Sequence, residues 1–396
     1  MSAPLSSDAT TQRVFVIAAE ESGDRLAAGL IREMRARLGT KAVFTGIGGR
    51  HMEEQGVTSL FPIHELSIIG IVAVAQKLPM VLARIREATE AVLAAKPDLL
   101  VIVDSPDFTH RVAKRVRNRD PSIPIVDYVS PTVWVWRSGR ARKMRAYVDR
   151  LLAVLPFEPE VHRKLDGPPC VYVGHPLMEH LSTLRPSAEE AARRAAEPPV
   201  LLLLPGSRGS EIKRNMDVFG ETLGRLSAQG VTFEPVLPTV PHLAERVREA
   251  SATWSVPPKL IVDDTEKRAA FRRARAALAK SGTVTLELAL AKVPMVAVYR
   301  VTALEAFIAR RVIQTTSIIL PNLILGENVI PEFLQDDFTP EKLVPALRDV
   351  LADTPMRQRQ LAGFARLDDI MSTDGKMPSA RAADVVIEML QNPKRT

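Results

Sequence analysis

The amino-acid sequence predicts an α/β protein with two doubly wound domains, each a parallel sheet covered by helices on both faces. Short apolar runs alternate with helical patterns from end to end of the chain, as expected for the buried strands of parallel sheets. These runs form two series, and the polar, proline-containing stretch Leu181–Pro199 separates them. We therefore expect one domain over residues 1–178, a second over 179–365, and a helical tail over 366–396 that could pack back on the first.

Each series contains five strand-like segments. In the first series they are Val14–Ala18, Val43–Phe44, Leu99–Val103, Pro124–Tyr128 and Leu151–Leu155. In the second series they are Val200–Leu204, Phe233–Leu237, Lys259–Val262, Ala276–Ala279 and Met295–Val298. In doubly wound proteins, ligands bind outside the carboxyl ends of the strands. The sequence therefore predicts a ligand site in a cleft between the two domains, and its polar groups should follow these segments.

The composition is that of a soluble globular protein, with 46% hydrophobic and 25% charged residues in a chain of 396. The single cysteine, Cys170, excludes an internal disulfide and fits a reducing compartment. Residues 1–12 are polar and do not resemble a secretory signal, so we expect a cytoplasmic protein. The uncharged segment Leu66–Gln76 is much shorter than the ~20 residues that span a bilayer, and it is either a buried helix or one in the membrane interface.

The net charge of +7 indicates an anionic partner or surface. The basic residues gather in three clusters: Arg111, Lys114, Arg115, Arg117 and Arg119; Arg137, Arg140, Arg142, Lys143 and Arg145; and Arg268, Arg272, Arg273 and Arg275. Phosphorylated substrates, an anionic membrane and nucleic acid all fit this pattern, and solvated helix faces are the alternative. Aromatic residues make up only 5% and do not alternate with the basic ones, which argues against a nucleic-acid partner.

Two strand-to-helix junctions in the second series predict a nucleotide diphosphate site. The first junction contains Gly206, Ser207 and Arg208. The second contains Ser281, Gly282 and Thr283, with Glu287 one helical turn beyond. Such turns present free backbone N–H groups to an anion, and the first adds a guanidinium. We expect Ser210 to cap the helix that follows the first junction.

The segment after the first strand contains Glu20, Ser22 and Asp24. Helix capping explains Ser22 and Asp24, whose side chains can accept hydrogen bonds from first-turn amides. Glu20 lies at the strand end and has no capping role. We therefore regard Glu20 as a candidate contact for a substrate hydroxyl, with a structural role as the alternative.

Asp104 follows the most apolar strand-like segment of the chain. In the residues after it, Ser105 suits an N-cap, Pro106 the first helical position, and Asp107 the first turn. Asp104 itself is left unexplained. A carboxylate that an apolar strand partly desolvates is suited to take a proton from a hydroxyl nucleophile, so we regard Asp104 as a candidate general base, with a structural acid as the alternative.

The sequence predicts neither a metal site nor a cofactor. No two of the seven histidines are spaced i,i+4, as a zinc-binding HExxH motif requires, and one cysteine cannot form a CxxC motif. The chain also lacks a Walker A motif and a GxGxxG turn after its first strand. These features argue against a P-loop NTPase and a standard dinucleotide dehydrogenase.

A series of short motifs follows the chain in order between Val14 and Pro331. They are Glu20–Asp24, Gly46–Gly49 with Met52 and Gly56, Asp104–Phe108, Tyr128–Pro131 with Trp134–Arg137, Leu155–Glu158, Gly174–Pro176, Leu204–Gly209, Ser281–Thr283 with Leu286 and Glu287, and Leu320–Leu323. Together these motifs resemble the lipid-A-disaccharide synthase family. One departure lies in the first motif, where the acid Glu21 stands in place of a small residue that the family usually has near the acceptor pocket.

The resemblance implies a GT-B glycosyltransferase, with two Rossmann-like domains facing across a cleft. Such an enzyme joins a UDP-linked 2,3-diacylglucosamine to 2,3-diacylglucosamine 1-phosphate and releases UDP with inversion, without a required metal. Its substrates carry acyl chains and phosphate, which implies peripheral binding at the inner face of the inner membrane. The oligomeric state stays open, with a homodimer as one candidate.

The resemblance also implies roles for individual residues. Asp104 matches the essential acid of the family, and Glu20 and Ser22 join it as candidate catalytic residues. Arg208 and helix N-terminal amides would stabilise the leaving diphosphate. Thr283 and Glu287 would hold a phosphate and the ribose diol, and Asn322 matches a position near the sugar donor. The substrate-binding candidates are thus Gly206, Ser207, Arg208, Ser281, Gly282, Thr283, Glu287 and Asn322.

Two other functions stay as alternatives. Another GT-B enzyme that uses a UDP-sugar, such as a UDP-N-acetylglucosamine 2-epimerase, would need the same nucleotide site but no groove for acyl chains. A basic protein that binds a membrane or nucleic acid without catalysis would release no UDP and would tolerate the loss of Asp104.

Overall fold

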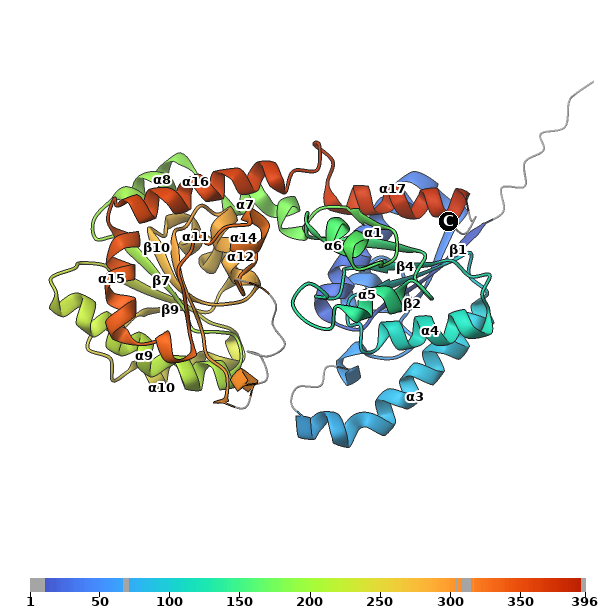
Figure 1. Ribbon diagram of the computed structural model, residues 1–396, viewed down its shortest axis with the longest axis horizontal. Coiled ribbons are helices and arrows are strands. Elements are labelled where there is room, and N and C mark those ends of the chain that lie inside the picture. Colours follow the sequence, from blue (N-terminus) through green and yellow to red (C-terminus); the bar gives the residue numbers. More distant parts are fainter. Residues whose placement is uncertain (1–10, 67–70, 304, 308–314, 316, 393–396) are drawn as a thin grey trace, which may run out of the picture. The chain divides into compact units, whose positions relative to one another are not determined.

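The structure of the protein is a computed structural model that describes residues 11–66, 71–303, 305–307, 315 and 317–392 (Figure 1). The chain divides into two compact units. Unit 1 contains Met1–Met178 together with Thr373–Thr396, and unit 2 contains Glu179–Ser372. Unit 1 is therefore assembled from both ends of the chain, and unit 2 is inserted into its sequence.

Unit 1 has a six-stranded parallel sheet in the order β2-β1-β3-β4-β5-β6. Its strands are β1 (Gln12–Ala18), β2 (Ala42–Ile47), β3 (Leu99–Val103), β4 (Ile125–Tyr128), β5 (Arg150–Ala153) and β6 (Cys170–Tyr172). The first five coincide with the strand-like segments of the sequence. The sixth was not predicted; it is a short strand at the edge of the sheet, and its residues are all only partly buried, so it need not be strongly apolar.

The helices of unit 1 are α1 (Glu21–Leu38), α2 (Arg50–Glu54), α3 (Ile71–Ala95), α4 (Thr109–Arg119), α5 (Gly139–Met144), α6 (Glu158–Lys164) and α17 (Pro378–Gln391). Helices α3 and α4 pack together, and their apolar side chains join those of β1, β3 and β4 in one core. Helix α17 packs along α1 (Figure 1). There Arg37 Nη1 donates to Asp384 Oδ1 at 2.6 Å, and Arg37 Nη2 donates to the carbonyl of Ala380 at 3.1 Å.

Unit 2 has a second six-stranded parallel sheet, in the order β12-β11-β10-β7-β8-β9. Its strands are β7 (Val200–Leu204), β8 (Glu234–Pro238), β9 (Lys259–Ile261), β10 (Ala276–Lys280), β11 (Met295–Tyr299) and β12 (Glu332–Leu334). The first five again coincide with the predicted segments. Strand β12 is three residues long and was missed for the same reason as β6.

The helices of unit 2 cover both faces of its sheet. They include α7 (Leu181–Leu184), α8 (Ala188–Ala195), α9 (Gly209–Ala228), α10 (Ala244–Ser251), α11 (Asp264–Arg273), α12 (Thr283–Leu290), α14 (Leu320–Leu325), α15 (Pro340–Leu351) and α16 (Pro355–Ile370). Helices α9, α10 and α15 form one core with β7, β10 and β11, while α12, α14 and α16 contact one another (Figure 1). Helix α16 runs across the boundary expected at residue 365 and stays in unit 2.

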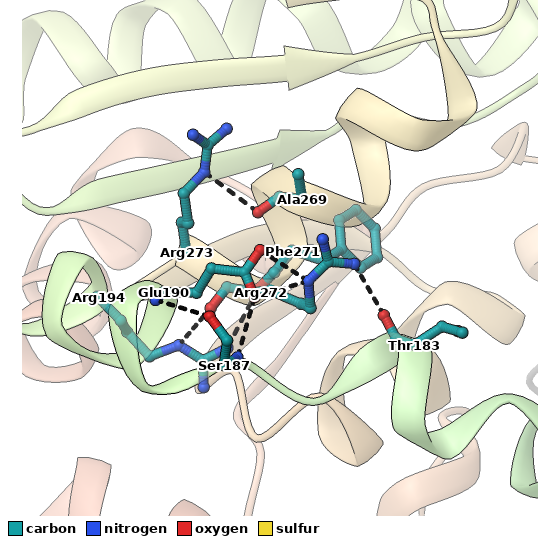
Figure 2. Close-up of polar contacts among 8 residues, drawn as sticks. All are labelled: Thr183, Ser187, Glu190, Arg194, Ala269, Phe271, Arg272 and Arg273. Atoms are coloured by element: carbon teal, nitrogen blue, oxygen red, sulfur yellow. Dashed lines mark hydrogen bonds and ion pairs between the residues drawn. The ribbon is translucent and has the colours of Figure 1, made fainter.

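The stretch Leu181–Pro199 lies between the strands of the two sheets and belongs to unit 2, which begins at Glu179. Helix α8 begins with a capping box, in which Ser187 Oγ accepts from the Glu190 amide and Glu190 Oε2 accepts from the Ser187 amide. Figure 2 shows how this helix is fixed: Arg272 Nε donates to both oxygens of Glu190 at 2.8 Å, and Arg194 donates to the carbonyls of Phe271 and Arg272 in the last turn of α11. Arg194 also donates to the carbonyls of Ala291 and Lys292, which follow α12.

These contacts also explain part of the third basic cluster. Arg272 neutralises Glu190, and Arg275 Nη2 lies 2.8 Å from Asp353 Oδ1 while its Nε donates to the carbonyl of Leu351. These two cations are therefore structural and do not belong to an anion site.

The predicted helical segment Leu66–Gln76 lies largely outside the described residues, because positions 67–70 and the side chains of 71–76 are not among them. In the part of the chain that the structure covers, no helix has the length and apolar character needed to cross a bilayer.

Candidate active site

In unit 1, the turns after two neighbouring strands carry Glu20 and Asp104. Strands β1 and β3 pair in parallel, with Ala18 opposite Val103, at the point where the order of the sheet reverses. Such a reversal is where ligands bind in doubly wound sheets. A Cβ atom on Gly23 would lie 3.2 Å from the carbonyl oxygen of Val103, so the glycine allows α1 to start close to β3.

Asp104 has an unusual backbone conformation and a partly buried carboxyl group. Its φ is 52° and that of Ser105 is 47°, both in the left-handed region. The Asp104 amide donates to the carbonyl of Tyr128 at 3.0 Å, and Asp104 Oδ1 accepts from the Ser105 amide at 2.7 Å. Burial raises the pKa of Asp104 and the charge of Glu20 adds to the rise, while the Ser105 amide opposes it. A residue with a left-handed backbone and a carboxyl group of raised pKa is suited to proton transfer at a functional site.

The predicted cap at Ser105 is wrong. Helix α4 begins at Thr109, because the two left-handed residues first turn the chain away from the strand. The Ser105 hydroxyl is buried and has no hydrogen-bond partner among the described residues. Thr109 Oγ1 instead donates to the carbonyl of Asp104 at 2.6 Å and so ties the helix start to the candidate base.

The caps predicted at Ser22 and Asp24 are also wrong. Helix α1 begins at Glu21, so Ser22 and Asp24 both lie inside its first turn. The residue before the helix is Glu20, and its side chain does not cap the helix. Asp24 is buried and caps a different helix, α2, by accepting from the amides of Gly49, His51 and Met52 at 2.8, 2.8 and 3.1 Å. Glu20 and Ser22 are exposed, which leaves their side chains accessible to a ligand.

A buried polar chain near Asp104 escaped the sequence analysis. His110 Nε2 donates to Asp127 Oδ2 at 2.9 Å, and His110 Nδ1 lies 3.2 Å from the hydroxyl of Tyr147. Asp127 is fully buried on β4, and the charges of Asp127 and His110 act on the pKa of Asp104 in opposite directions. An aspartate inside the apolar strand Ile125–Tyr128 was the available signal, since such a residue requires a buried partner.

In unit 2, the two predicted junctions follow strands that are neighbours in the sheet. Strands β7 and β10 pair with Leu204 opposite Ala279, and the order of this sheet also reverses between them. The fold thus brings the turn Gly206–Arg208 beside the turn Ser281–Thr283, although they are far apart in sequence. This edge of the sheet is the ligand-binding position of a Rossmann-like unit.

At the first junction, two of the backbone amides already have an acceptor within the chain. Glu211 Oε2 accepts from the amides of Ser207 and Arg208 at 3.0 and 3.3 Å. Helix α9 begins at Gly209 with Arg208 as its N-cap, so Ser210 is not the cap. Gly206 has a φ of 129°, and a Cβ there would lie 2.4 Å from Glu211 Oε2. The glycine therefore makes room for the carboxylate that holds the turn, and Arg208 remains exposed.

Lys280 is a further cation at this edge that the sequence analysis did not select. It is the last residue of β10, and its Nζ lies 3.0 Å from Glu211 Oε1 and 5.2 Å from the centre of the Tyr299 ring. Lys280 and Arg208 therefore both contact Glu211. An anion that reaches this edge would meet two cations held by one carboxylate.

The second junction presents the open N-terminus of a helix. Helix α12 begins at Thr283 after Gly282, and no side chain caps it. The first amides of an α-helix have no acceptor within the helix, so they are available to an anion. Thr283 is exposed, whereas Ser281 is buried and donates to the carbonyl of Ile318 at 3.3 Å. Glu287 is half-buried one turn later; burial raises its pKa, and Lys267 and Arg268 partly offset that rise.

Asn322 is a structural residue in this arrangement. Its side chain is buried, and Nδ2 donates to the carbonyl of Ile330 and to Glu332 Oε1, both at 2.9 Å. Oδ1 accepts from the amides of Val329 and Ile330 at 3.1 and 3.0 Å. All of its hydrogen-bonding capacity is therefore used within unit 2. Asn322 can act on a ligand only by holding the segment around α14 in place.

Comparison with known proteins decides the family. The family model described as lipid-A-disaccharide synthetase matches residues 14–373. The chain belongs to this family. A lipid-A-disaccharide synthase of Rhodopseudomonas palustris (strain HaA2) is 65% identical over 380 residues, which cover 96% of the chain and 97% of the relative. The synthase of Bradyrhizobium diazoefficiens is 61% identical over 384 residues, which cover 97% and 98%.

Solved structures confirm the GT-B fold. A UDP-GlcNAc 2-epimerase from Neisseria meningitidis bound to UDP-GlcNAc has a TM-score of 0.63 and 11% identity, covering 96% of the chain and 100% of the neighbour. The glycosyltransferase of kitacinnamycin has a TM-score of 0.61 and 16% identity, covering 96% and 99%. At such identities the likeness concerns the fold alone. The synthase relatives are far more similar in sequence, so the epimerase alternative is not favoured.

Proposed function

We propose that the chain is an inverting glycosyltransferase of lipid A biosynthesis. It would join UDP-2,3-diacylglucosamine to 2,3-diacylglucosamine 1-phosphate and release UDP. The observation that carries this proposal is the pair of strand-end sites, a partly buried carboxyl group with a raised pKa at Asp104 in unit 1 and an uncapped helix start beside two cations in unit 2. A single displacement needs both a base for the acceptor hydroxyl and a site for the leaving diphosphate.

Asp104 serves as the general base in this proposal. Its carboxylate removes the proton of the acceptor hydroxyl as the oxygen attacks the anomeric carbon of the donor. Burial raises the pKa of Asp104, which makes the ionised carboxylate a better proton acceptor. Glu20 and Ser22 lie on the neighbouring turn with exposed side chains, and they would bind acceptor hydroxyl groups.

The edge of unit 2 binds the donor nucleotide. The amides of Gly282 and Thr283, at the start of α12, would donate to the diphosphate. Arg208 and Lys280 would supply positive charge as the diphosphate leaves. Thr283 Oγ1 would donate to a phosphate oxygen. Glu287, one turn further along the helix, would accept from the ribose hydroxyls. Gly206 and Ser281 shape this edge, since Gly206 makes room for Glu211 and the Ser281 hydroxyl is buried with a partner, while the exposed Ser207 hydroxyl would bind a phosphate oxygen.

Peripheral binding to the inner face of the inner membrane completes the proposal. Both substrates carry acyl chains, and unit 1 has exposed apolar side chains on α3, where Leu78 is 44% and Leu82 is 39% exposed. These residues are spaced i,i+4 and so lie on one face of the helix. A helix of this kind can insert its apolar face at the headgroup boundary.

Purified protein with both acylated substrates tests the function directly. We expect disaccharide 1-phosphate by mass spectrometry, equimolar UDP, and a product anomeric configuration opposite to that of the donor. Asp104→Asn should abolish product, whereas Glu53→Gln, an exposed acid of unit 1, should not. Glu287→Gln should raise the KM for the donor. Epimerised UDP-sugar without disaccharide would instead support the alternative enzyme.

A further inference from the structure

Two basic clusters of the sequence converge on one pocket of unit 1. Helices α4 and α5, together with the residues just before each helix, line a pocket of about 850 Å³. Its cationic side chains are Arg111, Lys114, Arg137, Arg140 and Lys143. The first two belong to one cluster of the sequence and the other three to the next. The fold therefore concentrates on one pocket the positive charge that the sequence distributes over two segments.

The pocket cations differ from their neighbours in having few acidic partners. Outside the pocket, Arg117 pairs with Asp149, Arg119 with Glu90, and both Arg142 and Arg145 with Asp166. Inside it, and within the described ranges, only Arg140 has an acidic partner, Asp107 Oδ1, at 3.2 Å. Close cations without counter-charges repel one another, so their convergence favours an anionic ligand.

Two further polar side chains complete the wall of the pocket. His110 and Tyr147 line it, Asp127 fixes the His110 ring from behind at 2.9 Å, and the Tyr147 hydroxyl lies 3.2 Å from His110 Nδ1. Burial raises the pKa of Tyr147 to about 12, so its hydroxyl adds no negative charge to the pocket. The pocket therefore combines several cations with a hydrogen-bonded polar wall.

The pocket lies beside the candidate base. Pro106 and Asp107 form part of its lining, and they are the second and third residues after Asp104. The charge of His110 also reaches the carboxyl group of Asp104. A ligand anchored in the pocket would therefore extend toward Asp104 with little intervening chain.

We propose that this pocket binds the phosphate of the acceptor sugar. The inference rests on the proposed function and adds to it the site that holds the acceptor. A phosphomonoester carries close to two negative charges and three acceptor oxygens, which several lysine and arginine donors can satisfy together. Anchoring the phosphate would fix the sugar so that one hydroxyl faces Asp104.

The double variant Arg111→Ala/Lys114→Ala tests this assignment. We expect the KM for diacylglucosamine 1-phosphate to rise roughly tenfold or more, because two charged donors are lost, while the KM for the UDP-sugar stays unchanged. Arg115→Ala is the matched control, since Arg115 lies on the same helix but outside the pocket. With an acceptor that lacks the phosphate, the double variant and wild type should have the same KM. An equal effect on both acceptors, or no effect, would overturn the proposal.

Two further measurements separate the possible failures. Titration with soluble glucosamine 1-phosphate should show binding to wild type and to Arg115→Ala but weaker binding to the double variant. This titration does not need turnover. If the wild type makes no disaccharide, the proposed function is refuted, and the titration alone then decides whether the pocket binds the sugar phosphate. Binding to phosphatidylglycerol vesicles should be the same for both variants. A specific loss in the double variant, with unchanged acceptor KM, would assign the pocket to lipid headgroups and overturn the proposal.

Discussion

Lys280 Nζ lies 3.0 Å from Glu211 Oε1 where β10 ends beside β7. Glu211 in turn accepts from the amides of Ser207 and Arg208, so one carboxylate connects the two strand-end turns of unit 2. The lysine and the carboxylate are both more than four-fifths buried, with side-chain exposures of 17% and 11%. Glu211 therefore preorganises the edge and also competes with any anion for Lys280.

Replacement of Lys280 by methionine should weaken UDP binding. The change removes one cation and leaves Glu211 to repel the diphosphate, so we expect a Kd about tenfold higher by isothermal titration calorimetry. Lys213→Met is the control, because Lys213 is exposed on α9. An unchanged Kd in the folded Lys280 variant would show that the lysine only supports Glu211.

Asp104→Asn should separate activity from stability. Asparagine tolerates the left-handed backbone at this position, so the fold should be kept. Loss of the base should lower kcat by about 10²- to 10⁴-fold. Because burial raises the pKa of Asp104, the ionised group destabilises the folded state above that pKa, and the variant should have a higher Tm than the wild type there. A lower Tm with retained turnover would contradict the role of base.

The same pKa shift predicts the acid limb of the activity profile in the wild type. Only the ionised carboxylate can accept a proton, so kcat/KM should fall as the pH drops through the raised pKa of Asp104. The fall should therefore occur above the ordinary range of an aspartate, which is about 3.9.

Asn322→Ala should mainly destabilise unit 2. The variant would leave the Ile330 carbonyl and the Val329 and Ile330 amides without their buried partner. We expect the free energy of unfolding to fall by about 3 kcal/mol in urea titrations. The donor KM of the protein that remains folded should change little. A stable variant with a strongly raised donor KM would instead indicate direct contact with the sugar.

Glu158→Gln should alter the dependence of stability on pH. Burial raises the pKa of Glu158 to about 8, so the folded state holds this proton more tightly than the unfolded state. The resulting stabilisation is complete below the ordinary glutamate pKa and is lost as the pH rises to about 8. Between pH 6.5 and 8, we expect the wild type to lose about 2 kcal/mol that the variant does not lose.

Glu160→Gln is the control for this measurement. Glu160 lies on the same helix, and its ion pair with Arg163 lowers its pKa to about 2, outside this range of pH. The free energy of unfolding is measured in urea titrations at several pH values. If it changes with pH equally in the wild type and in Glu158→Gln, Glu158 is already ionised in the folded protein.

The sequence alone predicted the fold class of both units and the position of most of their strands. Apolar runs located ten of the twelve strands in the described part of the chain, since most strands of a parallel sheet are buried on both faces and are largely apolar. It also located Asp104, Glu20 and the two turns of unit 2, because each follows a strand directly. What the fold added is which strand ends are neighbours.

Hydrogen-bond partners could not be predicted in the same way. Asp24 and Ser105 both have the residue types of a cap, yet Asp24 caps a helix that starts 26 residues later, at Arg50, and Ser105 caps none. Glu211 is three residues beyond Arg208 and takes the amides that seemed free. Such choices depend on tertiary contacts that a local pattern does not contain. The pocket cations likewise became distinct only once their neighbours were seen to have acidic partners.

Helix α17 has a consequence for biosynthesis of the protein. Its buried residues, among them Ala382, Ala383 and Val386, cover α1, which is made at the opposite end of the chain. Unit 1 therefore stays incomplete while the ribosome produces all of unit 2, and α1 keeps an uncovered apolar face until the final segment emerges. Emergence of α17, rather than of the first sheet, is the event that allows this half of the molecule to mature.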